Sequence, residues 1–539
     1  MEIFFSDKNF SLSANFVNMA DNGGPENILG LYRSRGADMP SLLRGGFSLA
    51  VIDNAGGKIF CARDRFGIVP FYYAQIDGNF SYGTSLKKIV GDPNFNAELN
   101  EEALHYYLFF QYSALPETFF KGVFKLPPAH YLVYENGNVS IKRYWRASFN
   151  SSAREFEQAA DTIDAAVRGA AGRCMLSGND TGAFLSGGVD SSYAAACAGV
   201  KKVFTVGFGS AGYDETENAA SLAKHIGAEH IAYQISSEEF FSSLHDVQFH
   251  MEEPLADPAA VAQFILCRET AKHVPAVISG EGADELFGGY NIYMEPFSLR
   301  KYAKLPRRLR KAVGKLAAKC PFNIKGKNFL IRGGKSVEER YIGNANIFTT
   351  EEANNILLSG TDAYPQKLTR QIYSLEPNAD DVTKMQLLDI SMWMADDILI
   401  NAFKMSGAHS LLLHTPYLDD AVYDAAAALP TRFRVSKNET KTAFRHAAAK
   451  ILPSATAARK KLGFPVPIRV WLREEKNYLF AKKYFTGETA KKYFKENILM
   501  DLLDGHFNGK RDNSRKIWTI LTFLIWHEVF LNENNKPWN

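Results

Sequence analysis

Short apolar runs separated by amphipathic segments dominate the middle of the chain. Apolar residues at 181–185, 202–208, 229–235 and 276–278 predict four short strands. Helices are predicted between and after them, at 191–200, 214–226, 237–250 and 258–273. Strands that alternate with helices favour a doubly wound α/β fold around a parallel sheet. A ligand of such a sheet is expected beyond the carboxyl ends of its strands.

The two ends of the chain depart from this pattern. Segments 46–53, 58–62 and 70–74 are separated by turn residues, which predicts strands in a β-rich N-terminal region. After residue 290 the pattern is helical, and 517–531 is apolar all round, as in a buried helix. We place a domain boundary near residue 150, with one domain over 1–150 and a second over 155–539.

The composition is typical of a large soluble enzyme. The chain has 539 residues, 46% of them hydrophobic, and a net charge of +3, which is too small to indicate a nucleic-acid or membrane partner. No segment approaches the roughly 20 apolar residues of a transmembrane helix, and the start lacks the basic region of a signal peptide. The five cysteines form no Cys-x-x-Cys pair, which favours the cytoplasm and argues against zinc, iron–sulfur or redox chemistry.

A glycine-hinged turn follows the first of these strands, after Phe184 and Leu185. Its sequence is Ser186-Gly187-Gly188-Val189-Asp190-Ser191-Ser192. The glycines let the backbone fold tightly, so the N–H groups at the helix start face the end of the strand. Together with the positive end of the helix dipole, these groups form a cradle for phosphate or pyrophosphate. Asp190 stands where a carboxylate can hold Mg²⁺ against the same phosphates.

A second glycine-rich turn follows the strand at 276–278. It reads SGEGADELFGGY over 279–290 and contains three carboxylates, Glu281, Asp284 and Glu285. The alternative explanation of both turns is a pair of ordinary loops in an α/β domain. Glycine suits a core poorly unless another group approaches the backbone closely, so two such turns favour a binding site.

Together, the two turns resemble those of the synthetase domain of asparagine synthetases and their relatives, the β-lactam synthetases and lasso-peptide cyclases. The resemblance implies an ATP-pyrophosphatase fold of the HUP class and AMP-forming amide synthesis with ATP and Mg²⁺. It implies ATP contacts from Phe184, Ser186, Gly187, Gly188, Asp190, Ser191, Val206, Ser279 and Gly280. Asp190 and Asp284 would hold the metal, and Glu281 would accept a proton from the attacking amine.

Two lysines near the C-terminus extend the resemblance. The stretch 459–467, RKKLGFPVP, is similar to the basic loop of the family, whose lysine, Lys461 here, neutralises charge that develops on the phosphates. A solvated basic turn is the alternative. Lys441 begins a Lys-Thr-Ala-Phe-Arg stretch similar to a Lys-x-x-Leu-Arg helix of the family, so it is a second candidate catalytic lysine.

The N-terminal region resembles the later half of a class II glutaminase domain, which has an Ntn-type sandwich of sheets and helices. The motifs are Arg-Asp-Arg-Phe-Gly at 63–67 and Phe-Tyr-Tyr at 71–73. That family works through an N-terminal cysteine, but Glu2 follows Met1 here and the first cysteine is Cys61, inside a predicted strand. We expect a truncated domain that does not hydrolyse glutamine. Cys61 is either a relocated nucleophile or, as its strand position favours, a packed core residue.

Several positions depart from the synthetase pattern. Leu412 stands for a glutamate of the family and His414 for an arginine, while Asn401 and Phe403 occupy positions that are usually charged or polar. These changes put aspartate in doubt as the substrate. They predict a pocket with Leu412, Phe403 and Tyr417 in its wall, suited to a larger or less polar acid. His414 is interpreted as a structural rather than a catalytic residue.

The sequence therefore predicts an ATP-dependent amide synthetase that activates a carboxylate as an acyl-adenylate for attack by ammonia or an amine. Specialised metabolites, peptides and sugar acids are the favoured substrates. The alternatives are an ammonia-dependent asparagine synthetase, an intramolecular lactam or peptide cyclase, and a non-catalytic scaffold. A homodimer is compatible with the sequence. The basic stretch 300–327 would dock an acidic partner or form a solvated helix, and the spacing of Leu305, Leu309, Val313 and Leu316 favours the helix.

Overall fold

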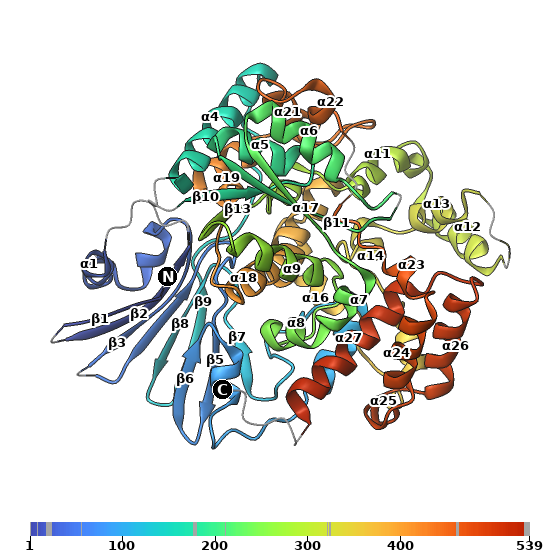
Figure 1. Ribbon diagram of the computed structural model, residues 1–539, viewed down its shortest axis with the longest axis horizontal. Helices are drawn as coiled ribbons and strands as arrows, with labels where there is room; N and C mark the ends of the chain where they lie inside the picture. Colours follow the sequence, from blue (N-terminus) through green and yellow to red (C-terminus); the bar gives the residue numbers. More distant parts are fainter. Residues whose placement is uncertain are drawn as a thin grey trace.

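The computed structural model describes residues 2–7, 9–17, 24–54, 56–175, 180–210, 212–320, 322, 325–459 and 463–532. Its N-terminal region contains two antiparallel sheets (Figure 1). The larger has the order β1 (Glu2–Ser6), β2 (Phe10–Val17), β3 (Gly46–Asp53), β4 (Ile59–Arg63), β8 (His130–Glu135), β9 (Asn138–Arg143). The smaller has the order β6 (Asn79–Gly83), β5 (Tyr72–Ile76), β7 (Val123–Lys125).

Tight turns explain two of the hairpins of these sheets. Asn136-Gly137 joins β8 to β9, and Asp77-Gly78 joins β5 to β6. All four residues have positive φ, between 48° and 80°. Two successive positive φ values define the type I′ turn, whose twist matches that of the flanking strands. The register of both hairpins is therefore set locally by the sequence.

The second half of the chain is built on a five-stranded parallel sheet. Its order is β12 (Glu229–Gln234), β11 (Lys202–Gly207), β10 (Thr181–Phe184), β13 (Ala276–Ile278), β14 (Leu412–His414). The first four are the strands that the apolar runs predict, and the doubly wound fold is confirmed. The edge strand β14 was not predicted, because three residues beside a helical segment carry no clear period-2 pattern.

Helices cover both faces of this sheet (Figure 1). Ala183 and Val203 pack against the helices α4 (Phe156–Met175) and α5 (Val189–Ala198). Their neighbours Phe184 and Phe204 point the other way, into a core that includes α9 (Ala259–Ala271). Successive side chains of a strand alternate between faces, so the central strands β10 and β11 contribute to two cores. The helix α6 (Thr216–Ile226) follows β11, as its periodicity predicts.

One helix prediction needs correction. The segment 237–250 forms two helices, α7 (Ser237–Ser242) and α8 (Leu244–Met251), which meet at Ser243. The basic stretch contains the helix α12 (Arg307–Lys319), and its leucines are largely exposed, in agreement with the solvated helix that the sequence favours. Leu309 is 50% exposed and Leu316 is 70% exposed. The remaining elements of the C-terminal region are helical, as predicted.

The two halves of the chain share one apolar core. The helix α3 (Glu101–Phe110) contributes to it from the N-terminal region, and α27 (Ser514–Leu531) contributes from the other end of the described chain. The Tyr107 hydroxyl donates a hydrogen bond to the Thr519 carbonyl at 2.9 Å. The rings of Phe119 and Trp526 have centroids 5.1 Å apart. The burial predicted for 517–531 is confirmed, and no helix within the described ranges has the length and apolar character needed to cross a membrane.

Candidate active site

The first glycine-rich turn leaves the carboxyl end of β10 and enters α5. Gly187 has φ = 72°, a conformation that few other residues adopt without strain, and Gly188 caps the helix. The Ser186 N–H donates to the Ser191 hydroxyl at 3.1 Å, and the two hydroxyl oxygens are also 3.1 Å apart. These bonds hold the loop in a fixed shape at the start of α5, as a phosphate cradle requires.

The second turn lies directly against the first. A Cβ atom added to Gly280 would be 3.0 Å from the Ser191 nitrogen, so only glycine lets the two loops approach this closely. Gly282 has φ = 91° and begins the short helix α10 (Ala283–Phe287). The close packing of the two motifs explains why both are needed to define one site.

A cavity of about 490 Å³ opens beside these two turns. It is lined by nine of the residues predicted from the sequence: Phe184, Ser186, Asp190, Ser191, Val206, Ser279, Gly280, Glu281 and Asp284. Gly187 and Gly188 shape the loop without lining the cavity. Lys461 lies outside the described residues, but Gly463, Phe464 and Pro465 of the same basic loop line the cavity.

Lys441, from the C-terminal part of the chain, also lies at this site. It caps the helix α21 (Thr442–Ala448) with φ = 59° and is 1% exposed. Its Nζ lies 2.7 Å from Asp284 Oδ1 and also pairs with Asp190 Oδ1. The two carboxylates predicted to hold a metal are thus joined by one buried ammonium group, an arrangement that the sequence did not predict.

The residues fit a magnesium ion that is held jointly with phosphates. Asp190 and Asp284 supply hard oxygen ligands from the first turns of two different helices, α5 and α10, beside the phosphate cradle. No group of three or more candidate metal-binding side chains occurs within the described ranges. Mg²⁺ commonly takes one or two carboxylates and completes its shell with water and substrate phosphates. Two carboxylates at the cradle meet that requirement.

A buried chain of polar groups forms part of the cavity wall. Trp393 Nε1 donates to the Tyr290 hydroxyl at 3.0 Å, and that hydroxyl donates to Glu285 Oε1 at 2.5 Å. Burial, reinforced by the neighbouring Asp284, raises the pKa of Glu285 to about 7. Sequence reasoning noted Glu285 and Tyr290 only as parts of their motif, and it missed Trp393, which lies 103 residues from Tyr290 in sequence.

The other end of the cavity is lined by neutral amides, by carboxyl groups and by the guanidinium group of Arg515. Asn401 Nδ2 donates to Gln263 Oε1 at 3.0 Å, and Asn401 is 4% exposed. Asp257 also lines the cavity, and burial together with Asp257 raises the pKa of the adjacent Asp397. Gln111 of the N-terminal region donates to Asp397 Oδ2 at 2.8 Å. The two halves of the chain therefore meet behind this end of the site.

The predicted substrate pocket of Leu412, Phe403 and Tyr417 is not formed. Leu412 and Phe403 line a separate cavity of about 260 Å³ against β2. The reason is the helix α18 (Ile400–Gly407), in which residues two positions apart point in nearly opposite directions. Asn401 therefore faces the large cavity while Phe403 faces away. The Tyr417 hydroxyl is buried and donates to the Asp190 carbonyl at 2.7 Å.

His414 ends β14 and is 4% exposed. Burial lowers its pKa to about 4, so its imidazole is neutral at physiological pH. Its carbonyl accepts a hydrogen bond from the Ser279 N–H at 2.9 Å. His414 does not line the large cavity, which agrees with the structural role inferred for it.

In the N-terminal motif at 63–67, the side chains of Arg63 and Asp64 make hydrogen bonds to the backbone of the fold. Arg63 donates to the carbonyls of Val69, Leu126 and Gly67, each at 2.9 Å. The Asp64 carboxylate accepts hydrogen bonds from five backbone N–H groups. Cys61 is 0% exposed, and burial raises the pKa of its thiol well above the usual value. A buried, protonated thiol is a poor nucleophile, so the structure favours the packing role of Cys61.

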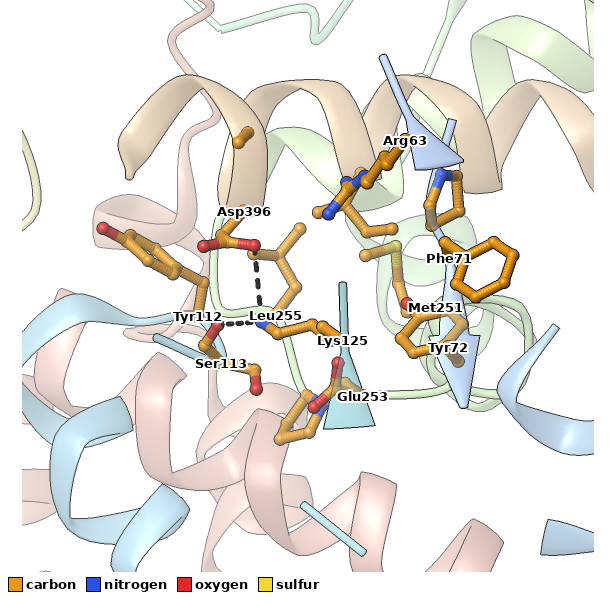
Figure 2. Close-up of a pocket in the computed structure, with 14 residues that line it drawn as sticks. Arg63, Phe71, Tyr72, Tyr112, Ser113, Lys125, Met251, Glu253, Leu255 and Asp396 are labelled. Atoms are coloured by element: carbon orange, nitrogen blue, oxygen red, sulfur yellow. Dashed lines mark hydrogen bonds and ion pairs between the residues drawn. The ribbon is translucent and has the colours of Figure 1, made fainter. Parts of the chain in front are cut away.

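A small polar cavity beside Arg63 lies between the two halves of the chain and is lined by residues of both (Figure 2). Its volume is about 20 Å³, which is room for about one water molecule. Lys125 crosses it, donating to the Ser113 carbonyl at 2.5 Å and lying 3.3 Å from Asp396 Oδ1. Burial raises the pKa of Glu253 on the same wall. The cavity is filled by its own ion pair and has no space for a substrate.

A parallel sheet with a phosphate cradle and a carboxylate pair at its carboxyl edge defines a nucleotide-using enzyme. The Asparagine synthase family model matches residues 162–528, and the Glutamine amidotransferase domain model matches residues 9–145. The chain belongs to the asparagine synthase family. It is accordingly a carbon–nitrogen ligase that depends on ATP, and the resemblance drawn from the two turns is confirmed.

Similar proteins carry related names. "Asparagine synthetase [glutamine-hydrolyzing] 1" of Bacillus subtilis is 36% identical over 518 residues, which cover 95% of this chain and 82% of that protein. "Asparagine synthetase [glutamine-hydrolyzing] 3" of the same organism is 24% identical, covering 82% of this chain and 70% of that protein. "Amidase chyE" of Penicillium rubens is 28% identical, covering 54% of this chain and 48% of that protein.

Proposed function

We propose that the chain joins a carboxylic acid to ammonia or an amine through an acyl-adenylate, with release of AMP and pyrophosphate. The observation that carries this proposal is the meeting of the cradle at 186–191, the carboxylates Asp190 and Asp284, and Glu281 around one cavity of about 490 Å³. That volume suits a nucleotide with a second small molecule. Mg²⁺ would supply charge neutralisation at the phosphates.

The residues divide the work between two steps. In the first, a substrate carboxylate oxygen attacks the α-phosphorus of ATP and pyrophosphate leaves, while the N–H groups at the start of α5 hold the phosphates. In the second, the amine attacks the acyl carbon and AMP leaves. Glu281 lines the cavity and accepts the proton that the amine loses. Lys461 is proposed to approach the phosphates from the basic loop.

The test is ATP–pyrophosphate exchange that depends on a carboxylate substrate. Asp190→Asn should lower exchange on the order of a hundredfold or more, because it removes a proposed metal ligand and charge from the site. Asp53→Asn, at the end of β3 in the N-terminal sheet, is the matched control. Formation of ADP in place of AMP would refute the mechanism. Absence of Mg·ATP binding by calorimetry would favour a non-catalytic scaffold.

The nitrogen source is proposed to be ammonia or a separately supplied amine. The support is Cys61, the only cysteine that the sequence has before residue 174, which is buried in β4 with a raised pKa. The 539-residue chain should therefore release no glutamate from glutamine, as measured by a coupled glutamate assay. Any glutamate release would overturn this proposal, and its loss in Cys61→Ala would identify Cys61 as the nucleophile.

The acid substrate is proposed to be a specialised metabolite, peptide or sugar acid. The support is the neutral pair Asn401 and Gln263 in the cavity wall, with Asn401 at one of the positions where the family usually has a charged or polar residue. A screen of carboxylic acids for AMP release tests this. Efficient conversion of aspartate and ammonia to asparagine would instead assign ordinary asparagine synthesis. An intramolecular cyclase would release AMP from a single substrate without an added amine.

The remaining predictions concern the whole protein. The domain boundary near residue 150, the cytoplasmic location and a homodimer stay proposals. Limited proteolysis would test the boundary, fractionation the location, and light scattering the oligomeric state.

A further inference from the structure

The Asp190–Lys441–Asp284 cluster contains two carboxylates and one ammonium group in a nearly closed environment. Asp190 is 8% exposed, Asp284 9% and Lys441 1%. Two ionised carboxylates brought together without a cation repel each other and lose hydration, so such a pair needs a counter-charge. Lys441 Nζ contacts one oxygen of each carboxylate, which is the bridging geometry that a bound cation would also use.

The backbone is arranged around this contact. Lys441 adopts the left-handed conformation, with φ = 59°, although it is not glycine. A non-glycine residue adopts this conformation at a cost in free energy, and such strain persists where the surroundings enforce it. Gly289 adds a second constraint. A Cβ there would overlap Asp284 Oδ1 and Lys441 Cε, so the backbone is shaped to admit the ammonium group.

We propose that Lys441 occupies the cation position between Asp190 and Asp284 in the nucleotide-free protein and transfers to the phosphates when Mg·ATP binds. This inference rests on the proposed function, because it assigns a role to a residue at the same site. The formal charge of the cluster is −1 with Lys441 in place. A divalent ion arriving alone would have to approach the ammonium group closely, which is strongly unfavourable in a buried site. When ATP is bound, its negatively charged phosphates pair with both the Lys441 ammonium group and the metal ion.

The consequence is an order of binding. Metal binding depends on the nucleotide, because only the nucleotide draws Lys441 away from the carboxylates. A purely structural ion pair would behave differently, since it would remain in place with and without ATP and its removal would create no new metal site. Lys441 is thus a positioning residue that prevents the empty carboxylate pair from capturing a free divalent ion.

The experiment measures Mn²⁺ binding by electron paramagnetic resonance at pH 8, without nucleotide and with ATP. The unmodified chain should bind no Mn²⁺ at millimolar concentration without ATP and one Mn²⁺ with ATP. Lys441→Met should bind one Mn²⁺ without ATP, on the order of a hundredfold more tightly than the unmodified chain. Adding Asp284→Asn to Lys441→Met should abolish that binding.

Lys404→Met is the matched control. Lys404 is also buried, and its Nζ lies 2.5 Å from Glu252 Oε2, but within the described ranges it forms an ion pair with that carboxylate alone. This variant should gain no Mn²⁺ site. If Lys441→Met binds no more Mn²⁺ than Lys404→Met, the inference is wrong. If Lys441→Met does not fold, the unmodified chain provides the test. Mn²⁺ binding to the unmodified chain without nucleotide, if Asp284→Asn abolishes it, would overturn the inference. Failure to bind Mn²⁺ even with ATP would instead contradict the proposed function.

Discussion

Lys441 and Asp190 are 251 residues apart in sequence, yet one ion pair joins them. The sequence identified both residues, because each belongs to a motif with a recognisable chemistry. Their pairing could not be predicted, because it depends on a left-handed residue and on a glycine whose missing side chain makes room. Likewise, Asn401 and Phe403 looked equivalent as sequence positions, but the helix points them into different cavities.

The space at Gly289 yields the first prediction. Gly289→Ala places a methyl group on Asp284 Oδ1 and Lys441 Cε, so the ion pair must separate. We expect a loss of at least about 2 kcal/mol in unfolding free energy, with weakened Mg·ATP binding. Urea denaturation and calorimetry measure the two effects. Gly172→Ala in α4 is the control, because no atom lies within 4 Å of its added Cβ. Equal stabilities of the two variants would contradict the geometry.

The second prediction concerns His414. Its pKa is lowered to about 4 in the folded chain, while the unfolded chain protonates near the usual 6.5. Stability is therefore complete above pH 6.5 and is lost as the pH falls towards 4. Removing the group by His414→Gln should reduce that loss by up to about 3 kcal/mol. Denaturant titrations at pH 7 and pH 4.5 compare this variant with His225→Gln, an exposed control. Identical pH dependence in both variants would show that His414 does not contribute.

At the scale of elements, the sequence predicts where the strands form better than it predicts what packs against each helix. The runs that became β10, β11 and β13 are short and largely buried, so burial on both faces favoured one interpretation. The edge strand β12 is more exposed and contains Glu229, His230 and Gln234. The helix α12 was also predictable as a solvated helix, from its period and its charge. Periodicity specifies a face but not whether another element covers it. Leu309 and Leu316 remain half exposed or more.

This exposure gives the third prediction. Leu309→Gln and Leu316→Gln should each change the unfolding free energy by less than about 0.5 kcal/mol, because neither side chain leaves water on folding. Leu503→Gln, at a fully buried position of α26 (Glu496–Phe507), should cost about 3 kcal/mol or more. Thermal and urea unfolding measure all three. A large cost at Leu316 would mean that α12 is covered by a contact in solution.

At the scale of the molecule, the two family-like regions are bound into one core rather than linked as independent units. Phe119 and Phe120 of the N-terminal region pack on Trp526 of α27, and Trp526 Nε1 donates to the Glu252 carbonyl at 2.9 Å. The change of pattern near residue 150 gave no sign of this contact. Contacts between distant segments leave no local period, so sequence reasoning separated what the fold joins.

The fourth prediction tests this coupling. Trp526→Ala should cost about 3–5 kcal/mol, because it opens a large cavity in the shared core. Hydrogen exchange should then accelerate together in α3 and in α27. Phe4→Ala, at a side chain that is 73% exposed, is the control. Faster exchange confined to α27 would show that the two regions unfold separately.

The shared core also affects folding during synthesis, because its two parts are made at different times. The aromatic residues of 106–120 emerge from the ribosome roughly 400 residues before α27, which must cover them. At about 5–20 residues per second, that delay is roughly 20–80 s. During it, an unusually aromatic surface has no native partner and is open to chaperones or to neighbouring nascent chains. Slowing translation should therefore lower the yield of folded protein, whereas supplying a chaperone that binds exposed aromatic segments should restore it.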